Sequence, residues 1–118
     1  MKRRWFFWFG FAFILAVGSF MLRPTTACRP DERDYEAVML ADLYQMRSCI
    51  DVHRYRTGRY PRDMEALIGF GCLRDVPMDP ITKSNDTWVL QRNDEGEIMD
   101  VHSGAPGVGL DGTRYRVW

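Results

Sequence analysis

The sequence predicts an α+β protein in which an N-terminal membrane helix is followed by a long amphipathic helix packed on a small antiparallel β-sheet. Three observations lead to this fold class. Residues 5–22 contain no charged side chain, residues 35–53 carry apolar side chains at helical spacing, and two short segments after residue 86 have the composition of strands. Because 118 residues suffice for one small core, we divide the chain into an anchor at 1–23 and a single domain at 24–118.

The N-terminal segment has the length of a single membrane span. The 18 residues from Trp5 to Leu22 would form a helix of about 27 Å, close to the thickness of a bilayer core. Three basic residues precede this run and one follows it. The N-terminus is therefore expected in the cytoplasm, the helix in the inner membrane and residues 24–118 in the periplasm, with Trp5 and Trp8 at the inner headgroups. Two alternatives remain open: a signal peptide that is cleaved, and a lipid on Cys28.

Charge is distributed unequally between these two parts. The whole chain balances 16 basic against 16 acidic residues, but residues 24–118 hold 12 basic residues and all 16 acidic ones, a formal charge of −4. Proteins that bind nucleic acids usually carry a basic surface. The acidic domain argues against a nucleic-acid partner, and the chain is too short for the two lobes of a typical nucleotide-dependent enzyme.

The domain begins with a predicted long helix. Four acidic residues between positions 31 and 36 suit a helix N-terminus because they complement the helix dipole. A stripe of side chains at spacings of three and four then marks one buried face that runs to about Tyr55, and Gly58 with Pro61 ends the helix. The stripe consists of Tyr35, Met39, Leu43, Met46, Ile50 and His53.

A short helix and three strands are predicted after the long helix. Residues 62–70 have the pattern of a short helix that is closed by glycines. Residues 87–91 and 98–102 are the first two strands, joined by a polar turn at 93–96 that contains glycine. A last strand at 114–118 is expected to close the antiparallel sheet.

The three cysteines, Cys28, Cys49 and Cys72, do not have the spacing of a zinc site, since they form no C-x-x-C pair and have no nearby pair of histidines. A compartment outside the cytoplasm permits disulfides, and Cys49 can pair with Cys72 if the end of the long helix meets the loop that carries Cys72. Buried thiols at both positions are the alternative.

Several turn motifs of the domain occur in the order found in one known family. The end of the long helix leads into the turn Gly58-Arg59-Tyr60-Pro61, and a Pro-x-Asp-Pro loop and an aromatic residue follow it. A Gly- and Asp-rich segment comes last. Over residues 36–118 the chain resembles the major pseudopilins of type II secretion and, more broadly, type IV pilin-like proteins. The positions that carry the resemblance include Gly58, Tyr60, Pro61, Pro77, Asp79, Pro80, Trp88, Gly104, Gly112 and Trp118.

The resemblance implies a structural subunit that is not an enzyme. Such subunits are held in the inner membrane by their N-terminal helices and assemble into a short periplasmic filament that pushes folded proteins out of the cell. The implied partners are other pseudopilin subunits and the inner-membrane components of the secretion system. The segment for anchoring and assembly contains Trp5, Trp8, Phe11, Leu15 and Leu22.

The N-terminal segment departs from the family pattern. Gly10-Phe11 matches the end of the family's leader, but Leu15 stands where the family has a glutamate that pairs with the neighbouring subunit's amine. Cleavage after Gly10 would leave only 12 apolar residues, too few for a span, so an uncleaved anchor is expected. Leu15 also favours an alternative function, a membrane- or lipid-anchored periplasmic interaction module with a pilin-like head that does not enter a filament.

Asp111 and Ser103 are candidate calcium ligands. The family's C-terminal loop binds calcium through two Asp side chains together with backbone and hydroxyl oxygens, and Asp111 and Ser103 match two of these positions. Pro106 stands where the first Asp would be. Calcium is the one cofactor that the resemblance implies.

We predict no catalytic residue. Asp100, His102 and Ser103 have the residue types of a hydrolase triad. On a strand, however, Asp100 and His102 share one face while Ser103 points to the other. We therefore interpret these residues as a strand end that enters a loop.

Overall fold

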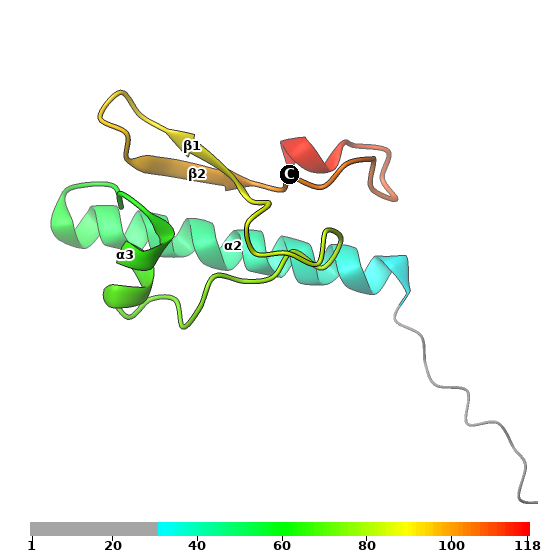
Figure 1. Cartoon of the computed structure of the whole chain (residues 1–118), viewed down its shortest axis with the longest axis horizontal. Coiled ribbons are helices and arrows are strands. Elements are labelled where there is room, and N and C mark those ends of the chain that lie inside the picture. Colours follow the sequence, from blue (N-terminus) through cyan, green and yellow to red (C-terminus); the bar gives the residue numbers. More distant parts are fainter. Residues whose placement is uncertain (1–30) are drawn as a thin grey trace, which may run out of the picture.

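The computed structural model describes residues 31–118, which form an α+β domain around one long helix (Figure 1). Helix α2 (Glu32–Thr57) runs the length of the domain, and the short helix α3 (Met64–Gly69) lies beside its C-terminal half. The strands β1 (Val89–Arg92) and β2 (Ile98–His102) form an antiparallel hairpin. This architecture confirms the predicted α+β class with a long helix and a small antiparallel sheet.

The predicted membrane anchor at 1–23 lies outside the described residues, and so do its members Trp5, Trp8, Phe11, Leu15 and Leu22. Within residues 31–118, no helix combines the length and the apolar character that a membrane crossing requires.

Helix α2 has strong local signals at both ends. Asp31 is the N-cap, and it forms a reciprocal capping box with Asp34, whose carboxylate accepts a hydrogen bond of 3.0 Å from the Asp31 N–H. At the other end Gly58 adopts a left-handed conformation with φ +76°, and its N–H donates to the carbonyl oxygen of Arg54. The helix therefore ends at Gly58, as the sequence predicts.

One face of α2 forms the core of the domain together with α3 and β2. The four central residues of the predicted stripe are buried, which confirms that part of the prediction. The prediction is wrong for the first and last residues of the stripe. Tyr35 and His53 are only half-buried, and Glu36 and Cys49 are buried instead. Each fully buried apolar side chain contributes about 1.5–3 kcal/mol to folding. The centre of the core contains Met39, Leu43, Met46 and Ile50 of α2, Leu67 of α3, and Ile98 and Val101 of β2.

The hairpin follows the predicted pattern with small shifts. Strand β2 has the predicted bounds, whereas β1 begins two residues later than expected, at Val89. Leu90 lies opposite Val101, and a register irregularity follows between Gln91 and Arg92. Buried residues of β2 face α2, whereas β1 is largely exposed, so β2 is the strand that anchors the sheet to the helix.

The prediction of a third strand at 114–118 is wrong. This segment contains a short 3₁₀-helix, η1 (Tyr115–Val117), and the N–H of Trp118 donates to the carbonyl oxygen of Tyr115. Residues three apart share a face in a 3₁₀-helix and lie on opposite faces of a strand. The rings of Tyr115 and Trp118 pack edge to face with centroids 5.2 Å apart, an arrangement that requires the helical turn.

Candidate interaction site on the C-terminal segment

The segment 103–118 is held against α2 by a buried carboxylate of the helix. The Oε1 atom of Glu36 accepts a hydrogen bond from the phenol of Tyr115 at 2.9 Å and another from the N–H of Leu110 at 2.8 Å. Burial, followed by this hydrogen bond to Glu36, raises the pKa of Tyr115 to about 12. The phenol therefore stays protonated at neutral pH and holds the segment over the N-terminal half of α2 (Figure 1).

Arg47 makes a second connection, further along the same flank of α2. Its Nε donates to the Asp100 carboxylate at 2.8 Å, and its Nη2 donates to the main-chain oxygens of Val101 and Trp118, each at 2.8 Å. Eleven residues separate Glu36 from Arg47, which is close to three helical turns, so both side chains project from one side of the helix. Together they join α2, β2 and the C-terminal segment.

Asp79 of the Pro-x-Asp-Pro loop organises the beginning of the segment. This residue is fully buried, and its Oδ1 accepts hydrogen bonds from the N–H groups of Ile81 and Thr82. Its Oδ2 accepts a hydrogen bond from the Ser103 hydroxyl at 3.0 Å. Because a buried carboxylate is costly unless its oxygens are hydrogen-bonded, the loop and the segment depend on each other for stability.

The other residues that carry the resemblance have structural contacts as well. The Trp88 indole N–H donates to the carbonyl oxygen of Pro77 at 2.7 Å, which fixes the loop to the start of the hairpin. The carbonyl oxygen of Pro61 accepts a hydrogen bond from the N–H of Ile98, and the guanidinium of Arg54 lies 4.4 Å from the ring centroid of Tyr60. Gly112 takes up a left-handed turn with φ +83°. Pro80 is half-buried beside Asp79.

The two predicted calcium ligands belong to different hydrogen-bond networks. Ser103 is fully buried and bonded to Asp79, whereas Asp111 is exposed. The Thr113 hydroxyl and the Thr113 N–H both donate to the Asp111 carboxylate and hold its pKa below the usual value. Across the described range 31–118, no group of three or more His, Cys, Asp or Glu side chains is arranged to hold a metal ion. Calcium binding is therefore implied by the resemblance alone.

The residues that resemble a triad are also divided between two networks. Asp100 Oδ2 lies 3.4 Å from His102 Nε2, and His102 Nδ1 lies 2.8 Å from the main-chain oxygen of Trp118. The Ser103 hydroxyl donates instead to Asp79 on the other side of the strand end. The structure thus brings Asp100 and His102 together with Arg47 and directs Ser103 elsewhere.

Sequence analysis missed Glu36 and Arg47 as the two side chains that hold the segment. Glu36 is one of the four acidic residues that suit the start of the helix, but it also lies three residues before Met39, at the spacing of the buried stripe. That position is the signal that marks it as a buried acid. Arg47 carries no comparable signal, because its partners lie more than 50 residues further along the chain.

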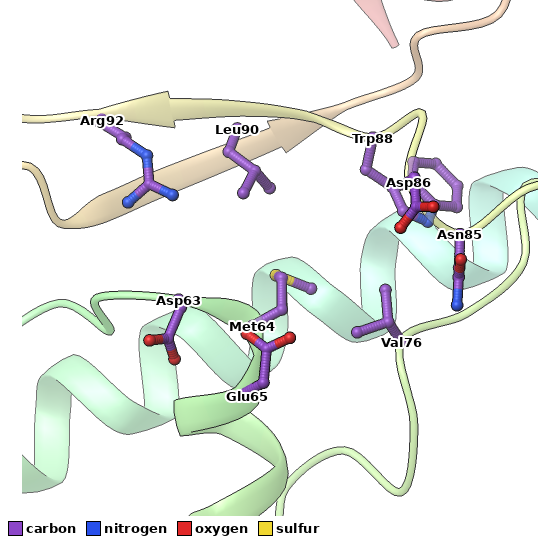
Figure 2. A pocket seen from close by; sticks show the side chains of 9 residues that line it. All are labelled: Asp63, Met64, Glu65, Val76, Asn85, Asp86, Trp88, Leu90 and Arg92. Carbon is purple, nitrogen blue, oxygen red and sulfur yellow. The ribbon is translucent and has the colours of Figure 1, made fainter.

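A cleft of about 300 Å³ lies between α3 and β1 (Figure 2). Its apolar side chains come from three parts of the chain: Met64 from α3, Val76 and Trp88 from the connecting segment, and Leu90 from β1. Three carboxylates also line it, those of Asp63, Glu65 and Asp86, together with Asn85 and Arg92.

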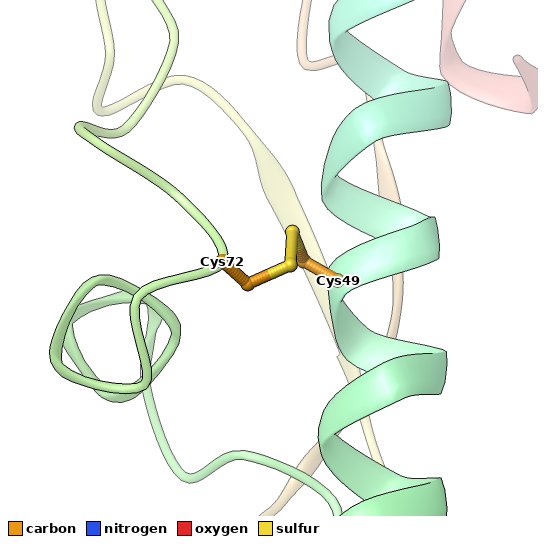
Figure 3. Close-up of a disulfide and its surroundings, with 2 residues drawn as sticks. All are labelled: Cys49 and Cys72. Carbon is orange, nitrogen blue, oxygen red and sulfur yellow. A yellow bond between two sulfur atoms is a disulfide. The ribbon is translucent and has the colours of Figure 1, made fainter.

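A disulfide between Cys49 and Cys72 ties α2 to the segment that follows α3 (Figure 3). This pairing is one of the two alternatives left open by the sequence, and Cys28 lies outside the described residues. The bond closes a loop with a sequence separation of 23 residues that includes α3. It therefore fixes the short helix, and with it one wall of the cleft, to the long one.

The likeness to pilin-like proteins depends on the turn motifs and their order, since each motif by itself is short. Comparison of the chain with family models, with curated proteins and with solved structures finds no match.

Proposed function

We propose that this chain is a non-enzymatic, pseudopilin-like structural subunit of a type II secretion or type IV pilus-like system. Residues 5–22 anchor it in the inner membrane, and residues 24–118 form a periplasmic head. Its partners are other pseudopilin subunits and the inner-membrane components of the system, with which it builds a periplasmic filament for protein export. The head contributes contacts between subunits and carries out no reaction.

The observation that carries the proposal is the second face of α2. This helix is about 39 Å long and packs on the head through one face only. On the opposite face Tyr44 is 77% exposed and Tyr55 is 90% exposed. An apolar surface that water reaches so freely is typical of a site for packing against another molecule. The exposed stripe at helical spacing consists of Ala37, Ala41, Tyr44, Val52 and Tyr55, and the half-buried Ser48 lies between Tyr44 and Val52.

Two further features support the proposal. The disulfide between Cys49 and Cys72 suits the periplasm, because disulfides persist in oxidising compartments. The C-terminal segment is held by Glu36 at the N-terminal end of α2, which is the end closest in sequence to the anchor. In the proposed orientation, the C-terminal segment is a second candidate surface for subunit contacts, on the side of the head nearest the membrane.

The test is crosslinking of the full chain in cells that carry or lack the secretion system. A photo-crosslinking amino acid at Tyr44 or Tyr55 should produce a ladder of oligomers only in cells with the system. The same amino acid at Asp94, in the exposed hairpin turn, is the control and should produce no ladder. Failure of both stripe positions to form oligomers would contradict the filament.

The alternative function is an anchored periplasmic interaction module that stays outside a filament. Leu15, in the position where the resemblance expects a glutamate, favours this alternative. A crosslink from Tyr44 to a single unrelated protein, in cells with or without the secretion system, would support it. The mass of the mature N-terminus distinguishes a cleaved, a retained and a lipidated anchor.

A further inference from the structure

Strand β1 presents an open edge. It pairs with β2 on one side, and no backbone group of residues 89–92 bonds to another segment within the part of the chain that the structure describes. The outer edge of β2 is covered instead, since the Ile98 N–H donates to Pro61 and the Val101 carbonyl oxygen accepts from Arg47. An unpaired strand edge is a template for the addition of another strand.

The open edge lies beside the cleft between α3 and β1. In Figure 2 the side chains of Leu90 and Arg92 extend from β1 toward α3, as expected for two residues on one face of a strand. Met64 and Trp88 contribute further apolar surface to the same cleft, and Trp88 is itself part of the core. A strand added to β1 would therefore lie beside a cleft in which its alternate side chains can contact the apolar groups of Met64, Trp88 and Leu90.

The charges around the cleft are mainly acidic. Asp63 uses one carboxylate oxygen to cap α3, accepting from the N–H of Ala66 at 2.8 Å. Glu65 and Asp86 are exposed, and their carboxylates form no hydrogen bond with any residue between 31 and 118. The single guanidinium, that of Arg92, donates to two main-chain carbonyl oxygens. Three carboxylates against one guanidinium make the cleft complementary to a basic ligand.

We propose that the cleft and the open edge of β1 together bind an extended segment of a partner protein that carries Lys or Arg next to apolar residues. The segment adds to β1 through main-chain hydrogen bonds, and its apolar side chains enter the cleft over Met64 and Trp88. Its basic groups meet the carboxylates of Glu65 and Asp86. This site is distinct from the exposed stripe of α2, none of whose residues lines the cleft.

The experiment titrates the full-length chain in detergent with short fluorescent peptides and measures anisotropy at physiological salt. One peptide alternates Val and Lys, and a matched peptide alternates Val and Glu. The first peptide should bind and the second should not. A third peptide keeps the Val–Lys sequence but carries N-methyl groups on consecutive backbone nitrogens, and it should bind much more weakly because neither of its edges can then donate hydrogen bonds to β1.

Two double variants of matched charge locate the site. Glu65→Gln with Asp86→Asn removes two carboxylates at the cleft, and we expect about a tenfold loss of affinity for the Val–Lys peptide. Asp94→Asn with Glu95→Gln removes two carboxylates at the exposed hairpin turn and should leave the affinity unchanged. Equal binding of the Lys and Glu peptides, equal effects of the two double variants, or no effect of N-methylation would each overturn the proposal.

Discussion

Glu36 and Tyr115 lie 79 residues apart in the sequence and share a buried hydrogen bond of 2.9 Å. The bond joins the second turn of α2 to η1, and the same oxygen of Glu36 also receives the N–H of Leu110. The C-terminal segment is therefore part of the folded head, because its release would leave a buried carboxylate without its donors.

This bond predicts a dependence of stability on alkaline pH. The native pKa of Tyr115, about 12, lies above the ordinary value of 10, so folding favours the protonated phenol. Its contribution is complete below pH 10 and is lost as the pH rises through 12. Urea unfolding at increasing pH should show this loss in the wild type and a smaller one in Tyr115→Phe. An equal decline in both proteins would contradict the assignment.

Arg47 should be irreplaceable by lysine. Its guanidinium reaches Asp100 and two main-chain oxygens at once, a geometry that a single ammonium group cannot reproduce. We expect Arg47→Lys and Arg47→Ala each to cost about 2 kcal/mol of unfolding free energy. Hydrogen exchange at the amides of Val117 and Trp118 should become faster in both variants. The control is Arg56→Lys, on the exposed side of the last turn of α2, which should be neutral.

Local signals account for the parts of the fold that sequence analysis predicted. Gly58 ends α2 through its own left-handed conformation, and the strand-forming residue types at 98–102 mark β2 with the observed bounds. The segment 114–118 has the composition of a strand, but contacts of Tyr115 with α2 determine its conformation. The roles of Glu36 and Arg47 were missed for the same reason, because their partners are remote in sequence.

The cleft and the cysteine pairing illustrate the same limit. The cleft forms only because α3, β1 and the segment between them pack side by side. The residue pattern of each single element does not predict this packing. The sequence allows Cys49 and Cys72 to pair, and buried thiols at both positions explain it equally well. Only the packing of α3 beside α2 distinguishes the two alternatives.

Removal of the disulfide should destabilise the head substantially. For a loop of this length the chain-entropy model gives about 3 kcal/mol of stabilisation. The double variant Cys49→Ala with Cys72→Ala should lose about that much in denaturant unfolding. A reducing agent should lower the melting temperature of the wild type and have no effect on the double variant. If the reductant affects both proteins equally, the bond does not contribute as described.

Calcium should not stabilise the head. Ser103 already donates to Asp79, and the Asp111 carboxylate accepts two hydrogen bonds from Thr113, so a calcium ion would have to compete with these partners. We expect the melting temperature of the full chain to be the same with millimolar calcium and with a chelator. A rise with calcium that disappears in Asp111→Asn would restore the calcium site implied by the resemblance.

Gly104 should tolerate no side chain, although its backbone conformation is one that other residues adopt. A Cβ atom at this position would lie 1.9 Å from the carbonyl oxygen of Thr87, and backbone cannot move aside as a flexible side chain can. We expect Gly104→Ala to cost about 3 kcal/mol or to prevent folding. Gly69→Ala is the matched control, because nothing lies within 4 Å of the added methyl group. Alanine there should be neutral or slightly stabilising, since Gly69 is the last residue of α3. Equal unfolding free energies for the two variants would show that the close approach of Thr87 to Gly104 does not hold in solution.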